Sequence, residues 1–278
     1  MTTPRIPAKL YGIIGHPLGH TMSPLLHNWG FELLKEDAAY MAFPVTPEAL
    51  PEFIRSVRTL PVSGLSVTIP HKQAIMPLLD SITPRAQTAG AVNTVFWHDG
   101  KLTGDNTDVT GFLQPLLPMK GRFTHALVLG AGGAANAVLT GLAELGVPLV
   151  TISNRNEERA LSLAKRFRIA SLPWEERHVE TADLIINTTP LGMSGESVHN
   201  SPVTDDFFAS TLAHAVAYDL VYNPLETRFL AQAKHAGRST IDGLSMFVAQ
   251  GAEQFRIWRG KELPFDEARA LIAAMLGL

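Results

Sequence analysis

The sequence predicts an α/β protein of two domains, the second of which contains a doubly wound parallel sheet. Its 278 residues suffice for two domains of ordinary size. Short apolar segments typical of buried strands alternate with longer segments in which apolar residues recur at helical spacing. A glycine-rich turn, residues 130–133, lies between one such strand and one such helix. Alternation of this kind favours parallel strands connected by helices.

The first 108 residues are expected to form a separate α/β domain. Ser23 and Pro24 indicate the start of a helix, with serine as the N-cap and proline in the first turn. Asp99–Gly100 indicates a hairpin turn between two strands. In chain order, the pattern predicts strands at 9–15, 39–43, 64–69, 93–97 and 101–102, and a helix at 50–57.

Residues 109–242 are expected to form the second domain. The predicted strands are 124–129, 149–153, 183–187, 215–220 and 239–241. The predicted helices are 111–117, which links the domains, and 134–145, 157–167 and 227–236. Two helices follow at 243–258 and 265–276, and we expect residues 243–278 to return to the first domain.

The composition excludes several classes of protein. A net charge of −3 and the absence of basic runs argue against a nucleic-acid partner. The chain has no cysteine, which excludes disulfides and thiolate chemistry, and its 10 histidines show no metal-ligand spacing, so no metal site is predicted. No segment has the apolar length of a membrane span or the features of a signal peptide. We therefore expect a cytoplasmic protein with no membrane partner.

The turn Gly130, Ala131, Gly132, Gly133, Ala134 and Ala135 fits the pattern G-x-G-x-x-A between a strand and a helix. Such glycines let backbone N–H groups approach a diphosphate, which the positive end of the helix then stabilises. The pattern predicts a Rossmann-type dinucleotide site. The alternative is a glycine turn that serves only close packing.

The end of the next strand indicates NADP(H) as the cofactor. An NAD site is expected to carry an acidic residue there for the ribose 2′-hydroxyl, but this chain has Asn154 followed by Arg155 and Arg159. A guanidinium suits a 2′-phosphate, and an arginine in the first turn otherwise opposes the helix dipole. The alternative is a pair of solvated arginines. Thr188 follows another buried strand, and it suits either the ribose or nicotinamide end or an ordinary turn.

Four segments of the first domain place small polar residues after apolar strands, and they suit a ligand with several hydroxyl groups. These segments are 19–24, 66–72, 90–94 and 104–108. With them the chain resembles the shikimate dehydrogenase family along nearly its whole length. The motifs that carry the resemblance are HTMSP, SVTIPHK, GAVNT, GDNTD, GAGGA, NRNEER and DGLSMFVAQ.

The resemblance implies reversible NADPH-linked reduction of 3-dehydroshikimate to shikimate, a step of aromatic amino acid (chorismate) biosynthesis. It makes residues 1–108 the substrate-binding and catalytic domain and residues 109–242 the NADP-binding domain, and it favours a homodimer. It implies that Lys72 exchanges a proton with the C3 oxygen while Asp108 orients it. Without the resemblance, Lys72 suits a surface charge and Asp108 suits a helix cap.

The resemblance also implies which residues bind the ligands. For the substrate these are Thr21, Ser23, Ser66, Thr68, Asn93, Asp108, Tyr222 and Gln250. For the cofactor they are Gly130, Ala131, Gly132, Gly133, Ala134, Asn154, Arg155, Arg159, Leu220 and Gly243, to which the strand-end position adds Thr188.

Two alternatives stay open, one because the chain departs from the family's usual sequence pattern and one because the same fold can bind a ligand without catalysis. Thr21 replaces a usual serine and Ser66 a frequent asparagine, which leaves the preference between shikimate and quinate open. The first alternative is therefore a quinate/shikimate dehydrogenase that uses NAD or both cofactors, although the acidic residue that would favour it is absent from the end of the second Rossmann strand. His71 replaces a common phenylalanine and is expected to be structural. The other alternative is a non-catalytic ligand sensor, which would be expected to lose Lys72 and Asp108 or the glycine turn.

Overall fold

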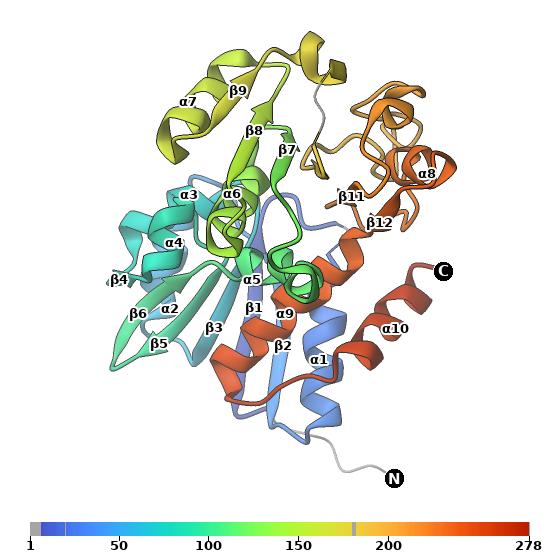
Figure 1. Cartoon of the computed structure of the whole chain (residues 1–278). Helices are drawn as coiled ribbons and strands as arrows, with labels where there is room; N and C mark the ends of the chain where they lie inside the picture. The colour runs from blue at the N-terminus through green and yellow to red at the C-terminus, as the bar shows by residue number, and fades with distance from the viewer. Residues whose placement is uncertain (1–6, 20, 180–181, 278) are drawn as a thin grey trace. The chain divides into compact units, whose positions relative to one another are not determined.

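The computed structural model describes residues 7–19, 21–179 and 182–277 and confirms the α/β class (Figure 1). The chain divides into two compact units. The first unit comprises Met1–Thr107 and Gln250–Ile272, and the second comprises Asp108–Ala249 and Ala273–Leu278. Among the described residues, no helix is long and apolar enough to cross a membrane.

The first unit contains a mixed six-stranded sheet in the order β2-β1-β3-β5-β6-β4. Its strands are β1 (Lys9–Gly15), β2 (Ala38–Pro44), β3 (Val62–Val67), β4 (Ser81–Ile82), β5 (Thr94–His98) and β6 (Lys101–Asp105). Strand β1 is parallel to β2 and β3, whereas β5 is antiparallel to β3 and β6. The β5–β6 hairpin turns at Asp99 and Gly100, both with positive φ, as the Asp-Gly pair predicts.

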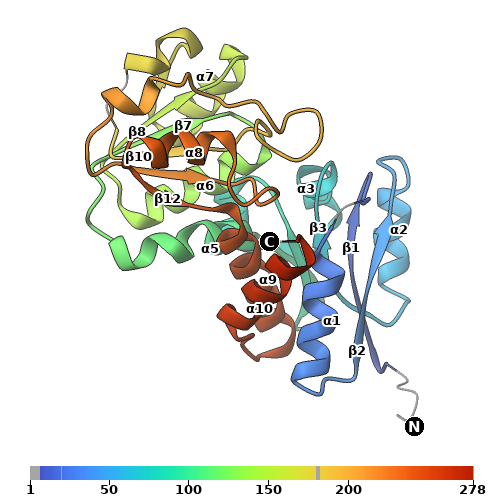
Figure 2. The same ribbon diagram turned by 90° about the vertical axis from the view of Figure 1, so that its right-hand side faces the viewer.

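Helices cover both faces of this sheet. They are α1 (Ser23–Leu33), α2 (Leu50–Val57), α3 (His71–Ala74), α4 (Pro84–Ala89), α9 (Gly243–Arg259, from Gln250 on) and α10 (Phe265–Met275). Helix α2 packs on the Ile14 side of β1, where Leu50 and Ile54 join the buried core. Tyr11 points to the other side and contacts Phe31 of α1 at 5.3 Å between ring centroids. Figure 2 shows α1 and α2 on opposite sides of β1 and β2.

Two predicted helix starts, at Ser23 and at Asp108, are wrong by one residue or more. Helix α1 begins at Ser23 itself, with Met22 in the N-cap position, so Ser23 does not cap it. Helix α5 (Thr107–Leu113) begins before Asp108, which lies in its first turn instead of capping it. Residues Gln114–Met119 then continue as a 3₁₀-helix rather than as the predicted α-helix, since prolines at 115 and 118 lack the N–H that an α-helix needs.

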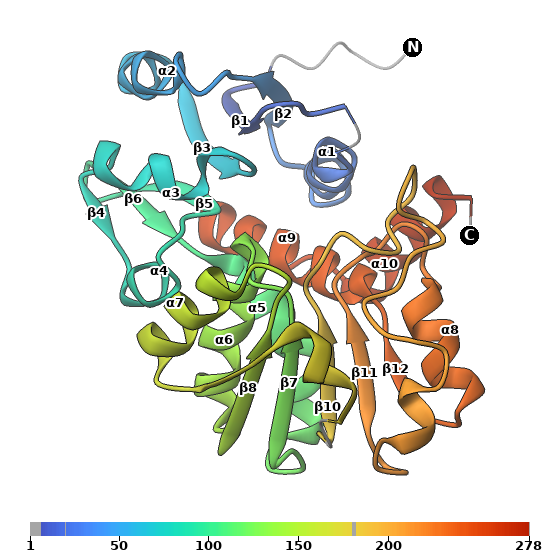
Figure 3. The same ribbon diagram turned by 90° about the horizontal axis from the view of Figure 1, so that it is seen from above.

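The second unit contains a six-stranded parallel sheet in the order β12-β11-β10-β7-β8-β9 (Figure 3). Its strands are β7 (His125–Leu129), β8 (Leu149–Ser153), β9 (Ala170–Leu172), β10 (Leu184–Asn187), β11 (Val216–Asp219) and β12 (Ser239–Ile241). Counted from β7, this is the Rossmann order 3-2-1-4-5-6, in which the order of strand addition reverses between β7 and β10 while all strands stay parallel. The predicted doubly wound sheet is confirmed.

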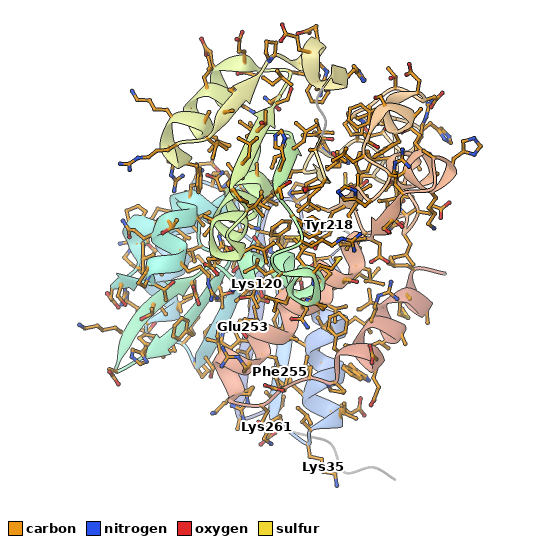
Figure 4. All side chains as sticks on the ribbon, viewed as in Figure 1. Lys35, Lys120, Tyr218, Glu253, Phe255 and Lys261 are labelled. Atoms are coloured by element: carbon orange, nitrogen blue, oxygen red, sulfur yellow. The ribbon has the colours of Figure 1, made fainter. Side chains whose placement is uncertain are left out.

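Helices lie on both faces of the second sheet as well. They include α5, α6 (Gly133–Leu145), α7 (Glu157–Phe167) and α8 (Arg228–His235). Phe229 of α8 packs with Phe208 and the buried Leu127 on one face. On the other face, Phe112 of α5 stacks on Tyr218 of β11 at 5.3 Å between centroids, and Tyr218 is labelled in Figure 4.

Candidate functional site

The glycine turn of the second unit joins β7 to α6 at the point where the strand order reverses. Gly130 has φ +110°, and a Cβ there would lie 2.6 Å from Thr188 Oγ1, so only glycine fits. A Cβ on Gly132 or Gly133 would meet no atom within 4 Å, so this side of the turn is open. Gly132 is the N-cap of α6 and offers no side-chain acceptor. The first N–H groups of α6 are therefore suited to bind an anion.

Asn154 holds the end of β8 against this turn. Its Oδ1 accepts from Ala131 N at 3.1 Å, and its Nδ2 donates to Asn156 O at 2.8 Å. Arg155 and Arg159 are exposed, and neither guanidinium has a hydrogen-bond or ion-pair partner within the described part of the chain. Asn156 caps α7 by accepting from Arg159 N at 3.0 Å.

The donor set of the second unit thus fits NADP(H). A diphosphate suits the open N-terminus of α6, and a 2′-phosphate suits the two exposed guanidinium groups. No acidic side chain stands at positions 154–156 to oppose that phosphate. Glu157 and Glu158 lie in the first turn of α7, where their negative charges interact favourably with the positive end of the helix dipole.

A buried carboxylate at the end of β11 organises two further loops, and the sequence analysis missed it. Asp219 Oδ1 accepts from Asn187 Nδ2 and Val221 N, each at 3.0 Å, and Oδ2 accepts from Thr227 Oγ1 at 2.6 Å. Burial raises the pKa of Asp219 to about 6, although these hydrogen bonds lower it. Asn187 Oδ1 in turn accepts from Thr189 N at 3.0 Å. Asp219 therefore links the loop after β10 to the loop after β11.

The predicted residues on these loops lie close to that link. Thr188 donates from N and from Oγ1 to Leu129 O, at 2.8 and 3.0 Å. Gly243 touches Leu220, since a Cβ there would lie 2.4 Å from Leu220 O. Tyr222 stacks on Phe247 at 4.9 Å between centroids, and burial raises the pKa of its phenol.

In the first unit, the predicted residues after β3 and before β5 are tied together through the backbone. Thr68 N donates to Ile14 O at 2.9 Å, and Thr68 O accepts from His71 N at 2.9 Å. Lys72 O accepts from Val92 N at 2.8 Å, which links the lysine's short helix to the GAVNT segment. The His71 ring is buried, with Nε2 2.6 Å from Val45 O, so it packs within the unit as expected.

The Asn93 carboxamide is buried and fixes the start of α5. Its Oδ1 accepts from Thr107 N at 2.7 Å and from Thr94 Oγ1 at 2.7 Å, and its Nδ2 donates to Thr107 Oγ1 at 3.0 Å. Asp108 directly follows Thr107. Asn93 therefore holds the backbone from which Asp108 extends.

Ser66 and Ser23 are joined through a tyrosine that no motif singled out. Tyr40 donates to Ser66 Oγ at 2.6 Å, and Tyr40 also shares a hydrogen bond with Ser23. All three side chains are buried. Thr21 Oγ1 accepts from Ser23 N at 3.3 Å. His20, the first residue of the HTMSP motif, lies outside the described residues.

The predicted substrate residues are divided between the units. Thr21, Ser23, Ser66, Thr68, Lys72, Asn93 and Gln250 belong to the first unit, and Asp108 and Tyr222 to the second. Gln250 is half-buried on α9, and another glutamine of that helix, Gln254, makes the buried contacts to Ser66 and to Asn93 O. Sequence reasoning missed Gln254 because helical spacing alone does not distinguish it from Gln250. Among the described residues, no three His, Cys, Asp or Glu side chains are placed to hold a metal.

Three family models match the chain. Residues 13–95 match a shikimate dehydrogenase substrate binding domain, residues 119–210 match shikimate / quinate 5-dehydrogenase, and residues 243–272 match a shikimate 5′-dehydrogenase C-terminal domain. The shikimate dehydrogenase (NADP(+)) of Oleidesulfovibrio alaskensis is 66% identical over 276 residues, which cover 99% of each chain. That of Maridesulfovibrio salexigens is 48% identical over 97% of this chain and 98% of its own.

Solved structures agree with these matches. Shikimate 5-dehydrogenase from Thermus thermophilus, in complex with NADP(H) and shikimate, superposes with a TM-score of 0.86 at 38% identity and covers 96% of this chain and 99% of its own. The enzyme from Listeria monocytogenes, in complex with shikimate and NAD, has a TM-score of 0.88 at 31% identity, with 98% and 99% covered.

Proposed function

The chain belongs to the shikimate dehydrogenase family, and from this premise we propose that it catalyses the reversible NADPH-linked reduction of 3-dehydroshikimate to shikimate. The observation that carries the proposal is the 66% identity over 99% of both chains to an NADP(+) shikimate dehydrogenase. The protein is accordingly an NADP-dependent oxidoreductase that acts on a CH–OH group, and its reaction is a step of aromatic amino acid (chorismate) biosynthesis.

The second unit supplies the residues for NADP(H). Gly130–Ala134 would hold the diphosphate at the open start of α6, and Asn154, Arg155 and Arg159 would bind the 2′-phosphate. Thr188, Leu220 and Gly243 would contact the ribose and nicotinamide end. When bound, the cofactor supplies or accepts a hydride at the substrate's C3 carbon.

The proton is handled by Lys72 and Asp108. During reduction the C3 carbonyl oxygen gains negative charge, which the Lys72 ammonium stabilises and then neutralises by donating a proton. During oxidation Lys72 takes that proton from the C3 hydroxyl. Asp108 hydrogen-bonds the same hydroxyl and orients Lys72, and its position depends on the Asn93–Thr107 contacts.

The remaining polar residues bind the rest of the substrate. Thr21, Ser23 and Tyr222 bind the carboxylate end of the substrate, and each has a hydroxyl group. Ser66, Thr68, Asn93 and Gln250 recognise the ring hydroxyls. We assign substrate binding and catalysis to residues 1–108 with 243–278, and cofactor binding to residues 109–242. We further propose that the enzyme is cytoplasmic and forms a homodimer.

An absorbance assay tests this proposal. Shikimate with NADP is expected to produce NADPH at a rate well above that of quinate with NADP or of either acid with NAD. Comparable rates with quinate, or with NAD, would instead support a quinate/shikimate dehydrogenase. No reduction of NADP in the presence of shikimate would overturn the proposal and support a ligand sensor.

A further inference from the structure

Gln254 lies at the centre of a buried hydrogen-bond network in the first unit. It is 1% exposed, on α9 between Glu253 and Phe255, which Figure 4 labels. Its Oε1 is 2.7 Å from Ser66 Oγ and 3.3 Å from His27 Nε2. Its Nε2 is 3.1 Å from Asn93 O and 3.1 Å from Thr94 Oγ1. One amide thus joins α1, the end of β3 and the start of β5.

The partners determine which way this amide faces. A backbone carbonyl oxygen can only accept a hydrogen bond, so the atom facing Asn93 O must be the NH₂ group. The other end is then the carbonyl oxygen, which can only accept. Ser66 and His27 must therefore both donate to Gln254 Oε1.

This requirement agrees with the surroundings of His27. Burial lowers the pKa of His27 to about 3, so the ring is neutral and carries one proton. That proton has to be on Nε2. Among the described residues, Nδ1 of His27 has no hydrogen-bond partner that would compete for it.

The consequence for Ser66 is that its only proton is committed. A serine hydroxyl has one donor and two acceptor lone pairs. The donor points to Gln254, and Tyr40 donates to one lone pair at 2.6 Å. Ser66 Oγ therefore has one lone pair with which it can accept a hydrogen bond from a ligand.

We propose that Gln254 is a positioning residue that sets substrate specificity by making Ser66 an acceptor toward the ligand. The ligand group at Ser66 must then be a hydroxyl that donates, and a carbonyl or carboxylate oxygen there is disfavoured. The inference rests on the proposed function, because that function places Ser66 at the substrate. Through Thr94 and Asn93, the same amide also supports Thr107, the residue before Asp108.

The test is the nearly isosteric variant Gln254→Glu, with Phe31→Leu as a matched control. A neutral glutamic acid keeps two of the contacts, since its O–H donates to Asn93 O and its carbonyl accepts from Ser66, but its single proton cannot also serve Thr94 Oγ1. An ionised glutamate cannot donate to Asn93 O, and repulsion between its charge and that carbonyl oxygen displaces the acceptor that fixes the Ser66 hydroxyl. Phe31 packs its ring on Tyr11 and Phe255 and has no polar side-chain atom, so its truncation perturbs packing alone.

The measurement is the KM for shikimate of each variant relative to the unaltered enzyme, at several pH values. Loss of one oriented hydrogen bond is worth about 1.4 kcal/mol, so for Gln254→Glu the ratio should rise roughly tenfold as the carboxyl ionises. His27 and Tyr40, the titratable groups of the network, are held neutral because burial lowers the first pKa and raises the second. The KM for NADP should stay constant, and Phe31→Leu should show neither effect.

A pH-independent ratio near one for Gln254→Glu would overturn the inference. Nitrogen-15 NMR of His27 adds a readout that does not depend on turnover. The Nε2–H tautomer is expected in the unaltered enzyme, and the Nδ1–H tautomer would overturn the inference even if shikimate is the substrate. If the unaltered enzyme shows the Nε2–H tautomer but does not oxidise shikimate, the proposed function fails while the assigned direction of the network stands.

Discussion

Replacement of Asp219 by asparagine is expected to remove a pH-dependent loss of stability from the second unit. The side chain is fully buried at the end of β11, where Asn187 Nδ2, Val221 N and Thr227 Oγ1 all donate to it. An asparagine can keep these contacts. Its oxygen accepts from Asn187 and Val221, and its NH₂ group donates to the Thr227 hydroxyl.

The magnitude follows from the pKa of the carboxyl group. Burial raises this pKa from 3.8 to about 6. Between these two pH values the folded chain therefore holds a proton that the unfolded chain has released. Stability from this group is fully present below pH 3.8 and is lost as the pH rises through about 6. Because one pKa unit corresponds to about 1.4 kcal/mol, the ionised carboxylate costs roughly 3 kcal/mol of unfolding free energy above that range.

Urea unfolding of both proteins at several pH values measures this cost. As the pH rises from about 4.5 to about 8, the difference in unfolding free energy between Asp219→Asn and the unaltered chain should change by roughly 2 kcal/mol in favour of the variant. Asp205→Asn is a control of opposite sign, since hydrogen bonds from Arg228 and Gln232 lower the pKa of Asp205 and its contribution is lost as the pH falls. Parallel pH curves for Asp219→Asn and the unaltered chain would refute the assignment of a raised pKa.

Three further substitutions test the site. Lys72→Ala should lower turnover by a factor of about 10² to 10⁴ while NADP still binds, and near-normal turnover would remove Lys72 from the proposed mechanism. Arg155→Ala should raise the KM for NADP roughly tenfold or more with little change in that for NAD, and equal effects on both cofactors would contradict contact with the 2′-phosphate. Gly130→Ala should weaken NADP binding and lower the melting temperature, because φ is +110° and the new methyl group would lie 2.6 Å from Thr188 Oγ1; an unchanged NADP affinity would argue against the turn as the diphosphate site.

The elements with strong periodicity could be predicted from the sequence, and the shortest could not. Strand β1 and helix α7 have the predicted bounds, because each buries a continuous or regularly spaced apolar face. Strands β4 and β9 have two and three residues, too few to show alternation, and they form only because a neighbouring strand offers hydrogen bonds. The prediction that Ser23 caps α1 is wrong, because local sequence does not determine the backbone dihedral angles at residue 22.

The buried polar residues set a different limit. The glycine turn and the arginines after β8 follow from local sequence, since a turn and a strand end are local features. Asp219 and Gln254 could not be assigned in this way, because each has a partner in a distant segment. Gln254 contacts Ser66 across 188 residues of sequence, and Asp219 contacts Asn187 across 32.

The chemistry of the partners explains why one of these positions carries a carboxyl group and the other an amide. Asp219 faces donors from Asn187, Val221 and Thr227, so a group with only acceptors satisfies them, at the cost of desolvating its charge. Around Gln254 one partner is the Asn93 carbonyl, which requires a donor, while Ser66 requires an acceptor. A carboxylate at 254 would leave that carbonyl unsatisfied and place negative charge against it, whereas a neutral amide satisfies both sides. Because an amide has a donor end and an acceptor end, Gln254 both donates to Asn93 O and accepts from Ser66, whereas a carboxylate, which can only accept, serves the Ser66 end alone.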